Sequence, residues 1–84
     1  MANVSISEKA ADELDELPVK IRARMDKLMK RLENWPKVSG AKALSGDLAG
    51  WYRLRTGDYR LRFYLSEGSV IVDKVGHRKD FYED

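Results

Sequence analysis

The chain has 84 residues, enough for one small domain, and we expect residues 1–84 to fold as a single unit. Its hydrophobic fraction of 43% argues against a disordered chain, and it contains no long apolar run that could span a membrane. It has no cysteine and only one histidine, so we expect no disulfide, no metal site and no cofactor, and we favour a reducing cytoplasm.

The net charge of +2 is modest, but the charges are unevenly distributed. Five acidic residues fall within residues 8–16, and six basic residues fall within residues 20–31. Adjacent acidic and basic helices often pair with each other or simply face the solvent. This pattern alone therefore does not indicate a nucleic-acid partner.

The first half of the chain predicts a strand followed by two helices. Residues 3–6 alternate polar and apolar, as in a short half-buried strand. Ser7 is a suitable N-cap for a short helix that Pro18 ends, and the same proline suits the first position of a second helix. Over residues 21–35 apolar side chains recur with a 4-3-4-3 spacing, and Pro36 then stops the second helix. The two helices form a helical hairpin.

The second half predicts three antiparallel strands. Residues 36–50 contain three glycines and no firm periodicity, so we interpret them as an irregular loop. Two-residue hairpin turns are predicted at Gly57-Asp58 and Glu67-Gly68. They would join strands at residues 51–56, 59–65 and 70–75. The expected fold class is α+β: an N-terminal strand, a helical hairpin and three antiparallel strands in one small sheet, with the helices on one face.

Two-residue turns also fix which side chains share a face of the sheet. One face would carry the apolar residues that the helices cover: Tyr52, Leu54, Leu61, Phe63, Leu65, Val70 and Val72. The other face would carry four arginines, two aromatic residues and one acid: Arg53, Arg55, Arg60, Arg62, Trp51, Tyr64 and Asp73. We expect Asp73 opposite Arg62, and a bulge near the end of the last strand to keep Lys74 away from the core.

The four arginines would form two directly opposed pairs, which destabilise a sheet by roughly 0.2–1 kcal/mol per pair. In the simplest interpretation this is a solvated face on which arginine stems cover apolar surface and Asp73 neutralises Arg62. We favour phosphate binding instead, because guanidinium groups match phosphate geometry. The flanking rings of Trp51 and Tyr64 could then stack on bases.

The last segment of the chain offers groups for proton transfer. His77 is the only side chain whose unperturbed pKa lies near neutrality, although a lone histidine is more often structural. Arg78 and Tyr82 are four residues apart and would share one face of a terminal turn, with Lys79 as a further cation. Phe81 fits a packing anchor.

The whole chain resembles the RelE toxins of the RelE/ParE superfamily, the toxin half of bacterial type II toxin–antitoxin modules. The resemblance rests on the order of the elements, on the run LSGDLAGWYRLRTGDYRLRFY and on the closing VGHRKDFY. It implies a cytoplasmic endoribonuclease that enters the ribosomal A site and cuts translated mRNA by attack of a ribose 2′-hydroxyl on the adjacent phosphodiester. It also implies a cognate antitoxin, operator DNA contacted only through that antitoxin, and no membrane.

The resemblance implies a role for each matching position. Arg60 corresponds to the arginine that steadies the transition-state phosphate, Arg78 to the arginine that helps the leaving group, and Tyr82 to a C-terminal tyrosine that positions the base or ribose. Six further residues, on the predicted outer face of the sheet and in the last segment, are candidates for substrate binding: Trp51, Arg53, Arg55, Arg62, Tyr64 and Lys79.

The chain departs from the RelE prototype at the general base. The prototype has two lysines before the turn, one implicated as the base, where this chain has Trp51 and Arg53. An arginine does not readily take a proton at neutral pH. Three alternatives stay open: His77 supplies the base, the ribosome and Tyr82 contribute, or the protein is a slow nuclease.

Two other functions also stay open. The ParE branch shares the fold but poisons DNA gyrase, and it usually has a longer helical hairpin and lacks the paired arginine and the terminal tyrosine. A catalytically degenerate toxin would only bind its antitoxin and operator. With a single histidine no two-histidine acid–base pair is available, so a nuclease would depend on charge stabilisation and positioning, and we expect weak activity on free RNA.

Overall fold

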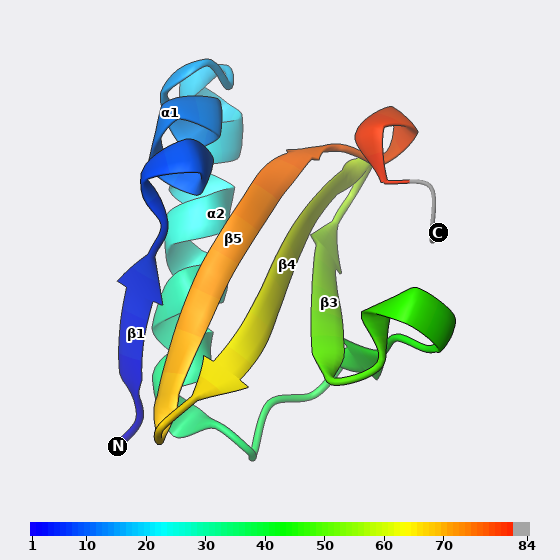
Figure 1. Ribbon diagram of the computed structural model, residues 1–84. Helices are drawn as coiled ribbons and strands as arrows, with labels where there is room; N and C mark the ends of the chain where they lie inside the picture. Colours follow the sequence, from blue (N-terminus) through cyan, green and yellow to red (C-terminus); the bar gives the residue numbers. More distant parts are fainter. Residues whose placement is uncertain (82–84) are drawn as a thin grey trace.

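The computed structural model describes residues 1–81, in which a mixed five-stranded sheet carries two helices on one face (Figure 1). The strand order across the sheet is β1-β5-β4-β3-β2. β1 runs parallel to β5, and the other neighbours are antiparallel. In chain order the strands are β1 Asn3–Ile6, β2 Lys42–Ala43, β3 Trp51–Thr56, β4 Tyr59–Ser66 and β5 Ser69–His77.

The two helices form the predicted helical hairpin. They are α1, Glu8–Asp15, and α2, Val19–Arg31. The Ser7 hydroxyl caps α1 by accepting a hydrogen bond from the backbone N–H of Ala10 at 3.1 Å, as the sequence predicted. Pro18 is the N-cap of α2, one position before the place that we expected. Neither helix in residues 1–81 has the length and apolarity that a membrane crossing needs.

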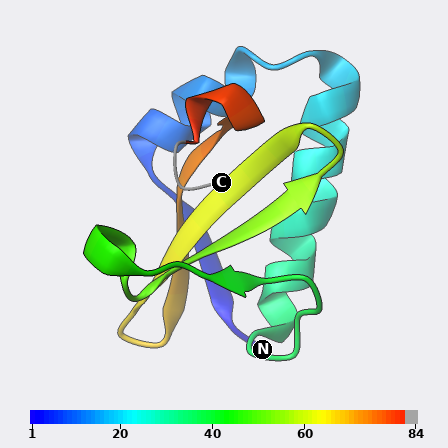
Figure 2. The same ribbon diagram turned by 90° about the vertical axis from the view of Figure 1, so that its right-hand side faces the viewer.

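The core lies between the helices and the sheet. Helix α2 contributes Met25 and Leu28, the 3₁₀ turn η1 (Leu32–Asn34) that follows it contributes Leu32, and all three side chains are buried. Figure 2 shows α2 running along the sheet. The sheet contributes Leu54, Leu61, Phe63, Val70, Val72 and Val75. One predicted core residue is wrong: Leu65 is 43% exposed, because it lies one residue from the end of β4, beside the exposed β4–β5 turn.

The predicted register of the β3–β4 hairpin is confirmed. Trp51 lies opposite Tyr64, Arg53 opposite Arg62 and Arg55 opposite Arg60. Because partners in a ladder share a face, the three pairs lie on the outer face of the sheet, away from the helices. That face is where the functional candidates gather.

The β4–β5 ladder contains the expected bulge, which changes one predicted pair. The register is as predicted up to Phe63 and Val72, and then shifts so that Lys74, rather than Asp73, lies opposite Arg62. The extra residue turns Lys74 to the outer face, where its ammonium group lies 4.6 Å from the centroid of the Phe81 ring and donates to the Asp80 carbonyl.

One strand was missed. Residues 36–50 are not wholly irregular, because β2 lies among them and pairs Lys42 with Arg53 and Ala43 with Tyr52. Two residues are too few to show a strand period in the sequence. The consequence is functional, since this short strand brings Lys42 onto the outer face beside Arg53. The second half of the chain also contains two short 3₁₀ turns, η2 at Gly46–Leu48 and η3 at Arg78–Asp80.

Candidate functional site

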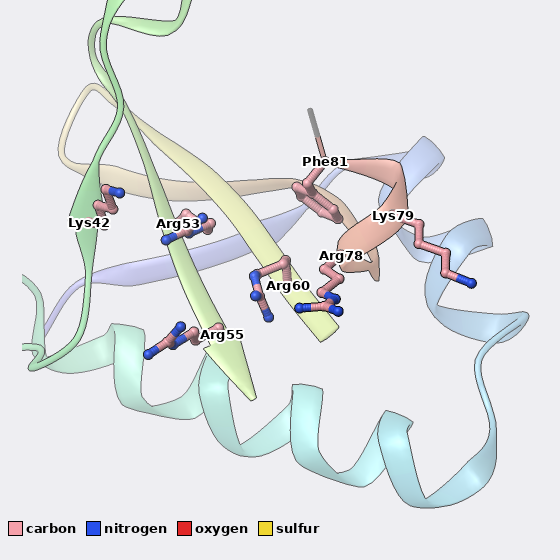
Figure 3. A pocket seen from close by; sticks show the side chains of 7 residues that line it. All are labelled: Lys42, Arg53, Arg55, Arg60, Arg78, Lys79 and Phe81. Carbon is pink, nitrogen blue, oxygen red and sulfur yellow. The ribbon is translucent and has the colours of Figure 1, made fainter. Parts of the chain in front are cut away.

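A cleft of about 450 Å³ opens on the outer face of the sheet (Figure 3). Its walls come from β2, β3, β4 and the C-terminal turn η3. Almost every side chain that lines it is a cation; the lining residues are Lys42, Arg53, Arg55, Arg60, Arg78, Lys79 and Phe81. A concave surface with this composition fits an anionic ligand.

The strands supply the floor of the cleft by simple alternation. Arg53 and Arg55 are two residues apart on β3 and therefore share a face, and Arg60 on β4 lies directly opposite Arg55. The wall is fixed by a long-range contact: the backbone N–H of Arg78 donates to the carbonyl of Asp58 at 2.8 Å. This hydrogen bond ties η3 to the β3–β4 turn and so holds Arg78 next to Arg60.

The end of the chain folds back over the sheet beside Gly76. Gly76 lies opposite Arg60 on β5 and is buried. A Cβ at this position would meet Asp80 Oδ2 at 3.4 Å and Phe81 Cε1 at 3.7 Å. Phe81 packs against the sheet with only 2% of its surface exposed, which confirms it as a packing anchor. The same ring closes one side of the cleft.

Arg60 is the central cation of the cleft. Only 6% of its surface is exposed, and its Nη1 donates to the carbonyls of Gly57 at 2.9 Å and Tyr59 at 3.1 Å. Burial is the largest cause that lowers the pKa of Arg60, and Arg53, Arg55 and Arg78 lower it further, while Asp58 acts in the opposite direction.

A lowered pKa means that the positive charge of Arg60 is disfavoured where it lies. An arginine still keeps its proton at neutral pH, so the repulsion is not relieved by titration. A bound anion would relieve it, and would interact with several guanidinium groups at once. The electrostatics of Arg60 therefore point to the same ligand class as the shape of the cleft.

Five of the predicted site residues line this cleft. Arg60 and Arg78 lie together in its centre, with Arg53 and Arg55 on the β3 side (Figure 3). Lys79 also lines it, although its amine points away from Arg60 (Figure 3).

Arg62 is not among the lining residues, because it is bound within the protein. Its Nε donates to Asp73 Oδ1 at 3.1 Å and its Nη2 donates to Asp73 Oδ2 at 2.8 Å. The two side chains are 16% and 18% exposed, so this is a sheltered two-point ion pair. The simplest interpretation, in which Asp73 neutralises this arginine, is correct for Arg62. Trp51 and Tyr64 share the outer face with the cleft but do not line it.

His77 does not lie in the cationic cleft. It lines a separate pocket of about 360 Å³ with Tyr59 and three acidic residues, Glu13, Glu16 and Asp80. Its Nδ1 accepts a hydrogen bond from the backbone N–H of Lys79 at 3.1 Å, which caps η3. Tyr82, the remaining catalytic candidate, lies outside the described residues. Within residues 1–81 no three histidine or acidic side chains gather as a metal site would require.

Sequence reasoning missed Lys42 and the part that Phe81 plays in the cleft. Lys42 was hidden in a segment without periodicity, and only its pairing with Arg53 reveals its face. Phe81 was expected to pack, but nothing in the sequence says that it packs beside Arg60.

Comparison with known proteins places this geometry in a family. The family model for the ParE toxin of the type II toxin–antitoxin system parDE matches residues 4–82. The curated protein Toxin RelE3 from Methanocaldococcus jannaschii is 27% identical over 74 residues, which is 84% of each chain.

Solved structures agree with that match. The toxin–antitoxin complex RelBE2 from Mycobacterium tuberculosis contains a chain that is 29% identical to this one, with a TM-score of 0.79 and coverage of 92% of this chain and 91% of that one. The isolated RelE toxin from E. coli shares the fold at 20% identity, with a TM-score of 0.76 and coverage of 92% and 84%. The chain belongs to the ParE toxin family of type II toxin–antitoxin systems, within the RelE/ParE superfamily.

Proposed function

We propose that this toxin is a ribosome-dependent endoribonuclease that cleaves translated mRNA and so arrests growth. The observation that carries the proposal is Arg60, a nearly buried guanidinium whose pKa is lowered by burial and by three neighbouring arginines. A site that holds a fixed, electrostatically disfavoured cation is arranged to stabilise negative charge, which is the main requirement of phosphodiester cleavage. The RelE relatives are compatible with this chemistry.

The reaction is attack by a ribose 2′-oxygen on the adjacent phosphorus. The bond from phosphorus to the 5′-oxygen breaks, the 2′-hydroxyl loses its proton, the departing 5′-oxygen gains one, and a cyclic phosphate remains. Arg60 stabilises the extra negative charge on the phosphate oxygens in the transition state. Arg78, beside it on η3, stabilises the departing oxygen.

The other cations of the cleft hold the flanking phosphates. Arg53, Arg55 and Lys42 line the β2–β3 side of the cleft, and Lys79 lines the η3 side. Their contribution is electrostatic, and it should therefore weaken as the salt concentration rises. Positioning of the 2′-hydroxyl for in-line attack is left to the ribosome, which is why we expect little cleavage of free RNA.

A cognate antitoxin is the protein partner that we propose. The relative from Mycobacterium tuberculosis was solved as a toxin–antitoxin complex, and the family itself is defined by such pairs. A strongly cationic cleft is also a suitable target for an acidic antitoxin segment. Operator DNA would be contacted only through the antitoxin.

The general base is not His77 in this proposal. His77 lines the pocket beyond η3 and its Nδ1 is engaged by the backbone of Lys79. We expect His77→Gln to cleave within a factor of about three of the wild-type rate, less than about 1 kcal/mol in the barrier, with an unchanged pH–rate profile. The rate of mRNA cleavage in a translating extract, followed from pH 6 to 9, is the measurement. If the variant loses a protonation step near neutral pH, His77 acts in catalysis after all.

The central test compares two substrates. Purified protein is added to a defined mRNA either alone or in a translating extract, and cut sites are mapped by primer extension. We expect cuts confined to the translated region, and at least about a hundredfold slower cleavage of the free RNA because substrate positioning is lost. Equal rates on both substrates would overturn the dependence on the ribosome. Absence of cleavage in both would overturn the nuclease function.

Inhibition of DNA gyrase is a second candidate function, favoured by the match to the ParE toxin model. Gyrase supercoiling in the presence of the purified protein distinguishes the two. The nuclease proposal predicts unchanged supercoiling at concentrations that stop translation. Inhibited supercoiling with intact mRNA would favour the gyrase function instead, and toxicity that survives loss of Arg60 and Arg78 would point the same way.

A further inference from the structure

Outside the cleft, the outer face of the sheet carries large side chains that the proposed cleavage does not use. Trp51 lies opposite Tyr64, which lies opposite Ile71, so that three bulky residues form a single row across β3, β4 and β5. We call Trp51, Tyr64 and Ile71 the aromatic row. The centroids of its two rings are 4.5 Å apart, with an interplanar angle of 51°. All three side chains are only partly buried, so part of each is accessible to a ligand.

An ion pair helps to hold Trp51, one end of the aromatic row, in place. The Arg62 guanidinium lies 4.9 Å from the centroid of the Trp51 ring, and Asp73 fixes that guanidinium at two points. Trp51 is therefore restrained by a neighbour that is itself restrained. A platform that is already ordered loses little conformational entropy when a ligand stacks on it.

The position of the aromatic row relative to the cleft is set by strand geometry. Trp51, Arg53 and Arg55 follow one another on the same face of β3, and same-face residues are about 7 Å apart along a strand. The row therefore lies about 14 Å from the Arg55–Arg60 pair, with Arg53 in between. A single strand with one phosphate at Arg60 would reach the row within a few nucleotides.

The cationic cleft followed by the rings of the aromatic row matches single-stranded RNA better than it matches a peptide. Such RNA presents charged phosphates and planar bases at regular intervals, and RNA-binding sheets use aromatic side chains on their strands as stacking platforms. An acidic peptide would satisfy the cations of the cleft but would not require rings at a fixed step from them. Continuity with the cleft thus favours a nucleobase as the occupant.

We propose that the aromatic row is a nucleobase-stacking subsite for the RNA strand whose scissile phosphate lies in the cleft. The inference rests on the proposed endoribonuclease function and adds a second contact to it, a few nucleotides from the cut. Because the contact is to a base, removal of that base alone should weaken binding even though every phosphate is kept.

The test is a base-deletion scan with the full chain. A short 2′-O-methyl RNA, which cannot undergo 2′-hydroxyl attack, is prepared as a set in which each member lacks one base. Dissociation constants are measured by fluorescence anisotropy at low ionic strength, where phosphate contacts are strongest. For the wild type we expect one position, or two adjacent ones, at which loss of the base weakens binding about tenfold.

Variants then assign that position to the aromatic row. In Trp51→Leu the intact RNA should bind about tenfold more weakly, and deletion of the same base should have no further effect. Trp51→Phe keeps an aromatic face and should keep the penalty for that deletion. Val19→Ala, at a 70% exposed site on α2, is the matched control and should behave as wild type. Thermal melts report whether each variant is folded, and the wild-type scan stands without any variant.

Three results would overturn the subsite: no measurable binding of the intact RNA, equal binding of all members of the set, or a penalty that persists unchanged in Trp51→Leu. The last two would leave the aromatic row as cross-strand packing or a protein-docking surface. If the protein cleaves mRNA in a translating extract but binds all members of the set equally, the nuclease proposal stands and the subsite proposal is wrong. If one base deletion weakens binding as expected but no mRNA is cleaved, base stacking is supported and the nuclease proposal is wrong.

Discussion

Replacement of Arg60 by alanine is expected to lower the rate of mRNA cleavage by about 10²–10³-fold, the usual cost of removing one donor that stabilises developing negative charge. The guanidinium is held by two carbonyls of the β3–β4 turn and needs little reorganisation when the phosphate gains charge. Arg60→Lys should recover little of the activity, because an ammonium group keeps the charge but not the planar fork. Single-turnover cleavage in a translating extract is the measurement.

The same substitution should leave the protein folded. Arg60 does face away from the helices, but it is buried rather than solvated. Loss of its hydrogen bonds to the carbonyls of Gly57 and Tyr59 should cost about 1 kcal/mol each, partly offset because repulsion from Arg53, Arg55 and Arg78 disappears. For a net loss of about 1 kcal/mol the expected fall in melting temperature is about 4–8 °C.

Arg55→Ala is the matched control for Arg60→Ala. It removes one positive charge from the opposed position in the same cleft, at a side chain that is exposed. We expect a loss of about tenfold or less, which shrinks as salt is added, because an exposed charge is strongly screened. Equal losses in the two variants would mean that only the net charge of the cleft matters. An unfolded Arg60→Ala protein would show that its role is structural.

The floor of the cleft could be predicted from the sequence because it is local. A two-residue turn at Gly57-Asp58 fixes the register of β3 and β4, and strict alternation then places Arg53, Arg55 and Arg60 on one face. The two helices could also be predicted from the sequence, because their apolar spacing and the Ser7 cap are short-range signals.

The wall of the cleft could not be predicted, because it depends on contacts between distant parts of the chain. The hydrogen bond from Arg78 to Asp58 joins residues that are twenty positions apart, and no local pattern encodes it. Lys42 reaches the site only because a strand of two residues happens to pair with β3. Propensity and periodicity carry no information about such pairings.

The sequence predicted only part of the difference between the arginines. Arg60 and Arg62 lie two residues apart on the same face of β4, and the sequence already placed Asp73 beside Arg62. A bidentate ion pair with Asp73 engages Arg62 on the outer face of the sheet, whereas Arg60 lines the cleft beside other cations. What the sequence did not show is that Arg60 would be nearly buried beside Arg53, Arg55 and Arg78, because that depends on how η3 folds back over the sheet.

Arg78→Ala is expected to lower cleavage by about 10²-fold while the melting temperature stays unchanged. The Arg78 side chain is 61% exposed, and its Nε lies 4.0 Å from a carboxylate oxygen of Asp58, which is 70% exposed. An ion pair in so much water contributes almost nothing to stability. The contact that positions η3 comes from the backbone N–H of Arg78, and alanine keeps it.

Asp58→Ala separates the two possible roles of that ion pair. If Arg78 acts on the departing oxygen, removal of its acidic neighbour frees the guanidinium for the substrate, and cleavage should be equal to or slightly faster than in the wild type. If the ion pair instead serves to hold η3 in place, Asp58→Ala and Arg78→Ala should be equally slow. The two variants remove charges of opposite sign. A contribution from net charge alone would therefore also change their cleavage rates in opposite directions. High salt screens that contribution but not the effect of a guanidinium placed at the leaving group. A deficit of Arg78→Ala that survives high salt, with Asp58→Ala unimpaired, therefore identifies a placed guanidinium at the leaving group.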